Sequence, residues 1–287
     1  MNPDAYFVCI GAQKAGTTWL AAHLDQHPDA WVSPVKELHV FDRLLRPDIS
    51  SWLDERFAAT LEDMRRRAAA GRQIRHPERL SVLQAMLDMP ASKDLDLTAA
   101  AYREFFANRV GDQRAFGELC PAYALLPEAG FTALLSAFPR ARFVYLLREP
   151  VARYWSQLRH ERRFRADFDP EAAFLSLLDE PGFGEHSDYG PVLQRLLACI
   201  PHNQICVVFY EHLLVERRRE TLTELSQFLG IRDLDGIVDQ VVYPGEAQAL
   251  PKELSRSGAE RFAASYDAVA SFMGTLPESW ECARSSR

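Results

Sequence analysis

The sequence lacks the features that mark membrane-spanning, disulfide-rich and broadly nucleic-acid-binding proteins. No run approaches the ~20 apolar residues that a membrane span needs. The five cysteines are odd in number and have no CxxC spacing, which disfavours a disulfide framework and a zinc site. The net charge of −7 disfavours nucleic acid as a partner, so any anion site is local. We therefore expect a cytoplasmic protein without a metal, a membrane span or a signal peptide.

What the sequence does contain is an alternation of apolar strand patterns and helical patterns. The near-continuous apolar runs are typical of a mostly parallel sheet covered on both faces. We predict a P-loop-like α/β three-layer sandwich, formed as a single domain over residues 1–287. The predicted strands lie near 7–11, 31–33, 115–119, 142–147 and 204–210, and the predicted helices near 18–27, 52–70, 98–110, 127–137, 150–165, 188–199 and 216–229.

The stretch from about 43 to 113 differs from the rest because it is charged, helical and interrupted by prolines. We interpret it as a helical insertion on one edge of the sheet, which acts as a lid or binds a substrate. The alternative is a helical pad that only covers the sheet.

The first strand pattern ends in a glycine-bracketed loop that opens into a helix. Gly11 and Gly16 have four residues between them, as in the nucleotide P-loop. The P-loop lysine should follow the second glycine, but that position is Thr17, and the only lysine is Lys14 inside the loop. Backbone N–H groups and a helix N-terminus still converge here. The loop is therefore predicted to bind phosphate or sulfate, in a different way from ATPases and GTPases.

A second group of residues typical of an anion-binding site follows the strand that ends at Leu147. Arg148 stands at a strand-to-helix turn, Pro150 suits the first turn of the helix, and Ser156 lies about two turns further on. Ligands of open α/β sheets bind at this edge, and arginine offers a planar fork to phosphate. A surface arginine at a helix start is the alternative. Two such sites on two strand ends predict one ligand with two separated anionic groups.

These segments resemble the sulfotransferase family. Residues 11–19 (GAQKAGTTW) are similar to its 5′-phosphosulfate-binding loop, and residues 147–156 (LREPVARYWS) to its 3′-phosphate-binding segment. Residues 36–42 (KELHVFD) and 117–123 (GELCPAY) resemble its bacterial and heparan-sulfate-type carbohydrate branch. The resemblance spans about 5–230. It implies 3′-phosphoadenylyl sulfate (PAPS) as the donor, no metal, and an acceptor hydroxyl on a carbohydrate or other polar metabolite.

The resemblance also implies roles for individual residues. Lys14 would stabilise the charge on the leaving oxygen, and Glu37 would be the general base, with His39 as the rival base. Lys36 would keep Glu37 ionised or contact the sulfuryl group, and Asp42 would orient His39 or bind the acceptor. The residues expected to bind the donor are Lys14, Ala15, Gly16, Thr17, Thr18, Trp19, Arg148 and Ser156.

Two parts of the sequence have no single clear role in donor binding. Trp19 is placed either to stack on adenine or to pack behind the loop. The late loop that closes over the 3′-phosphate in the family has no clear match, and Pro244-Gly245-Glu246 or Pro251-Lys252 would have to replace it.

Two other functions stay open at this stage. A P-loop nucleotide kinase would need a lysine after Gly16 and a magnesium-holding aspartate at a strand end, and the sequence shows neither. A non-catalytic nucleotide-binding protein would keep the anion sites without needing Glu37. The expected partner is a hydroxyl-bearing small molecule or glycan, and the oligomeric state is left open.

Overall fold

A computed structural model describes residues 1–73, 76–89, 94–234 and 248–285, apart from the side chains of 47–49. One sheet runs through the middle of this structure, with strand order β2-β3-β1-β4-β5 and parallel pairing at every junction. This confirms the five predicted strands and the predicted α/β fold. The strands are β1 (Tyr6–Gly11), β2 (Ala30–Val32), β3 (Ala115–Leu119), β4 (Arg142–Leu147) and β5 (Ile205–Phe209).

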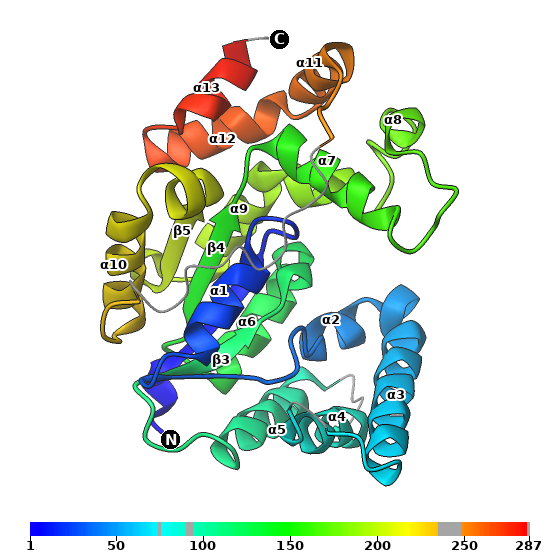
Figure 1. The fold of residues 1–287 in the computed structure, drawn as a ribbon. Helices are drawn as coiled ribbons and strands as arrows, with labels where there is room; N and C mark the ends of the chain where they lie inside the picture. The colour runs from blue at the N-terminus through cyan, green and yellow to red at the C-terminus, as the bar shows by residue number, and fades with distance from the viewer. Residues whose placement is uncertain (74–75, 90–93, 235–247, 286–287) are drawn as a thin grey trace.

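Helices cover both faces of the sheet, which explains why its central strands read as unbroken apolar runs (Figure 1). The predicted helices correspond to α1, α3, α5, α6, α7, α9 and α10, although α7 ends at Glu161 rather than near 165. Their bounds are α1 (Thr17–Asp25), α3 (Pro47–Ala69), α5 (Leu95–Ala107), α6 (Glu128–Ala137), α7 (Pro150–Glu161), α9 (Tyr189–Cys199) and α10 (Arg218–Leu229).

Further helices were not delimited from the sequence. They are α2 (Val40–Leu45), α4 (Glu78–Asp88), the short α8 (Pro170–Ala173), and the C-terminal α11 (Lys252–Arg261), α12 (Ala263–Met273) and α13 (Glu278–Ser285). None of the helices in the described ranges is long and apolar enough to cross a membrane.

The order of the strands creates a switch point between β1 and β4. From β1 the chain moves outward to β2 at one edge, whereas from β4 it moves to β5 at the other edge. Because parallel crossovers are right-handed, α1 lies on one face of the sheet and α6 and α9 lie on the other. The loops after β1 and β4 therefore diverge at their carboxyl ends. Such a divergence is where ligands of open α/β sheets bind.

Helices α2 to α5 lie between β2 and β3 in the chain, from Val40 onward, and cover the stretch of 43–113 whose role as an insertion stays a prediction (Figure 1). Its last helix covers the sheet directly, because Phe106 packs edge-to-face on Tyr6 of β1, with ring centroids 5.4 Å apart. The insertion is thus in part the covering pad of the alternative interpretation, and α3 forms its outer part.

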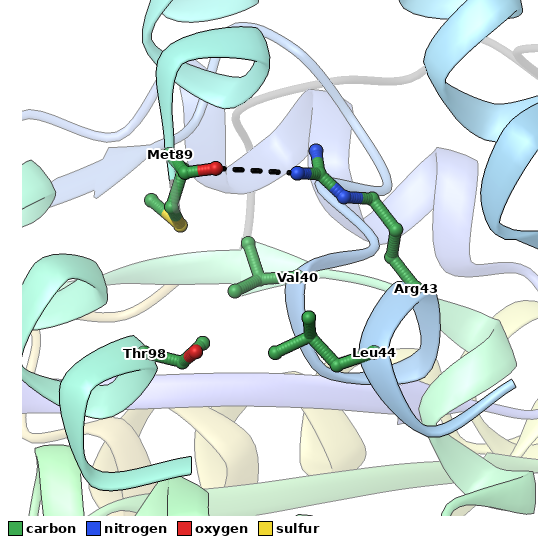
Figure 2. A pocket seen from close by; sticks show the side chains of 5 residues that line it. All are labelled: Val40, Arg43, Leu44, Met89 and Thr98. Carbon is green, nitrogen blue, oxygen red and sulfur yellow. Dashed lines mark hydrogen bonds between the residues drawn. The ribbon is translucent and has the colours of Figure 1, made fainter. Parts of the chain in front are cut away.

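The interior of the insertion is closely packed. A cavity of about 10 Å³, space for one water molecule at most, lies between α2, α5 and Met89, the residue that follows α4; Figure 2 shows the side chains that line it. The guanidinium of Arg43 spans this region and donates hydrogen bonds to the carbonyls of Met86 (2.8 Å) and Met89 (3.3 Å). A substrate does not fit there. Ligands of open α/β sheets bind at the carboxyl ends of the strands, and the predicted anion-binding residues lie at that edge.

Candidate active site

The loop between β1 and α1 has the geometry of an anion site. Gly16 precedes α1 with φ of 92°, and a Cβ at this position would lie 3.2 Å from the ring of Tyr210. Ala15 is buried, and its N–H donates to Ala12 O (3.1 Å) within the loop. Across the ranges that the structure describes, nothing accepts a hydrogen bond from the N–H groups of Gly16, Thr17 or Thr18. These donors are available to a phosphate or sulfate oxygen.

The second predicted anion residue lies against the first loop. Arg148 follows β4, and its Nη1 donates a hydrogen bond to Lys14 O at 3.2 Å. The guanidinium carbon lies 4.5 Å from the ring centroid of Tyr210, which directly follows β5. The structure thus brings Lys14 and Arg148 together at the switch point. Sequence reasoning did not single out Tyr210 as a site residue, although its place after an apolar strand was the available signal.

The backbone at Arg148 is fixed by groups from three later segments. The hydroxyl of Tyr189 on α9 donates to Arg148 O at 2.6 Å. The N–H of Glu149 donates to Glu211 Oε1 at 2.9 Å. The carboxylate of Glu149 caps α7 and accepts a hydrogen bond from Tyr266 on α12. The C-terminal helices therefore support the turn that presents Arg148.

The two other residues expected to bind the donor, Ser156 and Trp19, lie on α7 and α1, the helices that follow Arg148 and the donor loop. Ser156 is half-buried on α7, and its hydroxyl has no hydrogen-bond partner among the described residues. Trp19 is 8% exposed, and its ring packs on His23 with centroids 3.6 Å apart. A contact of Trp19 with adenine stays a prediction.

The late loop is only partly visible. Pro244-Gly245-Glu246 lie outside the described residues, while Lys252 is the first residue of α11. The chain comes back to α7 at Gln248, whose carbonyl accepts from Trp155 Nε1 at 3.0 Å. Because Trp155 precedes Ser156, Gln248 lies beside the predicted 3′-phosphate segment.

Lys36 connects the donor loop to the segment that carries the predicted base. Its Nζ donates to Thr18 Oγ1 (2.8 Å) and Thr17 Oγ1 (3.2 Å), and it lies 3.5 Å from Glu37 Oε1. An ammonium in this position contacts both the hydroxyls that begin α1 and the carboxylate proposed to take a proton.

Glu37, His39 and Asp42 form a chain of charged groups. His39 Nδ1 lies 2.6 Å from Asp42 Oδ2, and His39 Nε2 lies 3.6 Å from Glu37 Oε2. Glu37 and His39 both have positive φ, of 62° and 55°. Such a conformation costs of order 1–3 kcal/mol for a residue with a side chain, and it is found mostly at functional sites.

The charges in this chain are set by its neighbours. Burial raises the pKa of Glu37, but the His39 ring and the Lys36 ammonium outweigh it and bring the pKa to about 2. Burial lowers the pKa of His39, but Cys120, Asp42 and Glu37 outweigh it and the net shift is upward. Since the thiol of Cys120 is itself neutral, with its pKa raised by burial, we attribute the shift of His39 to the two carboxylates. Glu37 is ionised and His39 is protonated at neutral pH.

Lys14 sits among other cations. Burial lowers its pKa, and the charges of Arg163, Lys36 and Arg148 lower it further, to about 8. No carboxylate of the described residues forms an ion pair with Lys14 or Arg148. A dianionic group bound between them would relieve this repulsion.

Among the described residues, one group of side chains has the spacing of metal ligands. Ligand atoms of His39, Asp42 and Cys120 lie within 4.8 Å of one another, and all three residues are buried. The 2.6 Å contact between His39 and Asp42 is that of a charge-assisted hydrogen bond. That the chain works without a metal stays a prediction.

Comparison with known proteins identifies the family. A model described as the sulfotransferase family matches residues 7–235 of this chain. The chain belongs to the sulfotransferase family. The match includes the loop after β1, the segment of Lys36 and the turn at Arg148, so the family predicted from these motifs is confirmed. Comparison with curated proteins found no match.

Solved sulfotransferases share the fold. A sulfotransferase from Alicyclobacillus acidocaldarius superposes with a TM-score of 0.64 at 21% identity, over 96% of this chain and 98% of its own. The sulfotransferase domain of the Synechococcus PCC 7002 olefin synthase gives 0.52 at 17% identity, over 95% and 94%. The sulfotransferase domain from the curacin biosynthetic pathway gives 0.50 at 13% identity, over 95% and 98%. At these identities the likeness concerns the fold.

Proposed function

We propose that this sulfotransferase transfers the sulfuryl group of PAPS to an acceptor hydroxyl, with Glu37 as the general base. The observation that carries the proposal is the position of Lys36, which contacts the hydroxyls of Thr17 and Thr18 and lies 3.5 Å from Glu37. This contact places the proposed base beside the loop that would hold the 5′-phosphosulfate. A base and a donor so arranged allow in-line attack on the sulfur.

The donor would lie across the switch point. The N–H groups and hydroxyls of Thr17 and Thr18 would hold the 5′-phosphate, with Gly16 allowing its close approach, and Arg148 and Ser156 would hold the 3′-phosphate. Support comes from the free N–H groups at the start of α1 and from the contact between Arg148 and Lys14 O. In the reaction, the acceptor oxygen forms a bond to sulfur as the bond from sulfur to the 5′-phosphate oxygen breaks. Lys14 would stabilise the charge on this leaving oxygen, and Lys36 would contact the group in transfer.

Glu37 is a better candidate for the base than His39. A general base must be unprotonated, and two carboxylates raise the pKa of His39 and keep its ring charged. Glu37 is ionised and can accept the proton of the acceptor hydroxyl. Its low pKa makes it a weak base in the free protein, so we propose that loss of this proton to Glu37 accompanies formation of the oxygen–sulfur bond. His39, oriented by Asp42, would hold Glu37 in place.

The acceptor is proposed to be a carbohydrate or another polar metabolite. This proposal rests on the resemblance of residues 36–42 and 117–123 to the carbohydrate branch. Arg56 of α3 lowers the pKa of Glu37 through its charge, so the insertion acts on the proposed base electrostatically. This supports the interpretation of α3 as an acceptor-binding element. A cytoplasmic location is also a proposal, consistent with five free cysteines.

The donor assignment can be tested by thermal unfolding. Adenosine 3′,5′-bisphosphate, the product of transfer, should raise the midpoint by several degrees when present at about 100 times its Kd, because ligand binding then stabilises by about 2.7 kcal/mol. ATP with magnesium should shift it much less. The reverse order would support a P-loop kinase and contradict the proposal. Binding of the bisphosphate without any PAPS turnover would favour a non-catalytic nucleotide-binding protein.

A further inference from the structure

The segment that carries Glu37 and His39 needs an external support. Both residues adopt positive φ, with Leu38 between them, although none of the three is a glycine. Left-handed backbone at residues with a side chain persists only where the surroundings fix it. Leu38 is 1% exposed, so its side chain anchors the middle of the segment in the core. The direction of the two flanking side chains then depends on how the backbone around Leu38 is held.

The backbone N–H groups of the two residues that flank His39 are connected by hydrogen bonds to one carboxylate, that of Glu118. The N–H of Leu38 donates to Glu118 Oε2 at 3.0 Å. The N–H of Val40 donates to the hydroxyl oxygen of Tyr123 at 2.9 Å, and this hydroxyl donates in turn to Glu118 Oε1 at 3.1 Å. Glu118 lies on β3, and Tyr123 lies on the 3₁₀ helix η2 (Pro121–Leu125) that follows it. One side chain of the sheet therefore fixes two successive points of the strained segment.

Glu118 is an unusual residue for its place. Its side chain is 0% exposed in the middle of the sheet, opposite Val8 of β1, and forms no ion pair with a lysine or arginine in the described ranges. The hydroxyl of Tyr102 on α5 donates a further hydrogen bond to Oε1. Burying a carboxyl group without a lysine or arginine partner is costly, and burial raises the pKa of Glu118 to about 7. The hydrogen bonds from Leu38, Tyr102 and Tyr123 offset this cost, so the role of Glu118 lies in what these bonds hold in place.

We propose that Glu118 is a positioning residue for sulfuryl transfer, acting with Tyr123 to hold residues 37–40 so that Glu37 and His39 face the acceptor. The proposal rests on the proposed role of Glu37 as the base. It also gives the insertion a part in the reaction, because Tyr102 of α5 completes the set of donors around Glu118. The proton transfer itself stays with Glu37, and Glu118 touches neither donor nor acceptor.

The test uses Tyr123→Phe, which removes the hydroxyl that accepts from Val40 N–H and keeps the ring in the core. Turnover is measured as formation of adenosine 3′,5′-bisphosphate from PAPS in the presence of a glycan mixture. We expect turnover to fall roughly 10-fold or more, the equivalent of one lost hydrogen bond to a rigid group, with unchanged calorimetric affinity for adenosine 3′,5′-bisphosphate. The matched control is Ser226→Ala on α10, because the buried Ser226 hydroxyl likewise accepts a backbone N–H, that of Leu234, at 3.0 Å and lies outside the proposed site. Equal losses in both variants would contradict positioning.

A double-variant experiment separates positioning from a structural effect. If Tyr123 acts through Glu37, then Tyr123→Phe should lower turnover in the native background and have no further effect beside Glu37→Gln. If the fold losses in turnover of Tyr123→Phe and Glu37→Gln multiply in the double variant, the two residues act independently. That result would overturn the proposal while leaving Glu37 as the base. Full turnover of the single variant Glu37→Gln would instead overturn the proposed base.

Substitution of Glu118 itself gives a second readout. Glu118→Gln keeps an oxygen for the N–H of Leu38 and should retain more turnover than Glu118→Leu, which offers no acceptor. If both variants fold, as judged by thermal unfolding, and have the same turnover, the carboxylate oxygen has no positioning role.

Discussion

The two halves of the candidate active site are built in different ways. The donor loop, residues 11–18, is shaped mainly by local features, glycine at positive φ and the N-terminus of α1, although Lys14 also has positive φ and its carbonyl accepts from Arg148. The segment 36–42 takes its shape from β3, η2 and α5, and the contact of Leu38 with Glu118 joins residues 80 positions apart. Lys36 is the point where the two halves meet. A site can thus combine a local binding motif with a catalytic segment that only the completed fold creates.

The substitution Glu37→Gln should distinguish the two halves most clearly, because it should affect turnover and leave donor binding unchanged. Loss of a general base costs typically 10²- to 10⁴-fold in turnover, and we expect an effect of this order. The affinity for adenosine 3′,5′-bisphosphate should not change, because the donor loop is untouched. Turnover is measured as release of this bisphosphate from PAPS, and binding by calorimetry. Glu224→Gln, on the exposed surface of α10, serves as the control. Native turnover in Glu37→Gln would transfer the base role to His39.

Lys14→Ala should affect both binding and transfer. A preorganised donor aimed at developing charge is worth about 10²- to 10³-fold in kcat, so we expect a loss of this size. Affinity for the bisphosphate should also weaken, since Lys14 is one of the cations at the donor site. Lys14→Arg should recover part of the affinity. An unchanged affinity in Lys14→Ala would place the donor elsewhere.

Arg148→Ala should weaken donor binding more than transfer. A hydrogen bond to a charged group is worth about 1.5–3 kcal/mol, which corresponds to roughly a 10- to 100-fold rise in the Kd of the bisphosphate. Arg142→Ala is a matched control, because Arg142 lies at the opposite end of β4 and donates to Leu229 O at 2.7 Å. If both variants bind equally well, Arg148 does not hold the 3′-phosphate.

The smallest expected effect is a proton uptake at the donor loop. The pKa of Lys14 is about 8 in the free protein, and a bound dianion should raise it. The favourable interaction is then complete below about pH 8 and is lost as pH rises through the higher pKa of the complex. Calorimetry in buffers of different ionisation enthalpy should therefore show uptake of a fraction of a proton at about pH 9, where the phosphates of the ligand are already fully ionised. Lys14→Met should abolish this uptake.

Much of the fold could be read from the sequence because the signals are local. The strands β1 and β4 are apolar on both faces, and their runs predicted buried parallel strands at the right positions. The predicted end of a helix at 229 agrees with α10, which ends at Leu229 and is followed by Gly230 with φ of 70°. The bounds of α2 and α4 were not predicted, since these helices gain stability from packing inside the insertion rather than from a strong pattern of their own.

The site was less accessible to sequence reasoning than the fold. The sequence pointed to Lys14 and Arg148 as one ligand site, and the structure brings them into contact. Their roles, and those of Glu37 and His39, stay predictions. Alternation would place Glu37 and His39 on one face only in an extended segment, and both residues have positive φ, so the segment is not extended. That geometry depends on Glu118, and no local pattern reveals a hydrogen bond across 80 positions.

The hydrogen bond from Tyr266 to Glu149 has a practical consequence for anyone who shortens this chain. The family match ends at residue 235, so a fragment cut there would keep every recognised motif. It would nevertheless lose α12 and, with it, the hydroxyl that braces the first turn behind Arg148. Such a fragment would contain all the sequence motifs of the family but would be expected to bind the proposed donor more weakly. Shortened versions of the chain should therefore be assessed by their affinity for adenosine 3′,5′-bisphosphate rather than by sequence alignment.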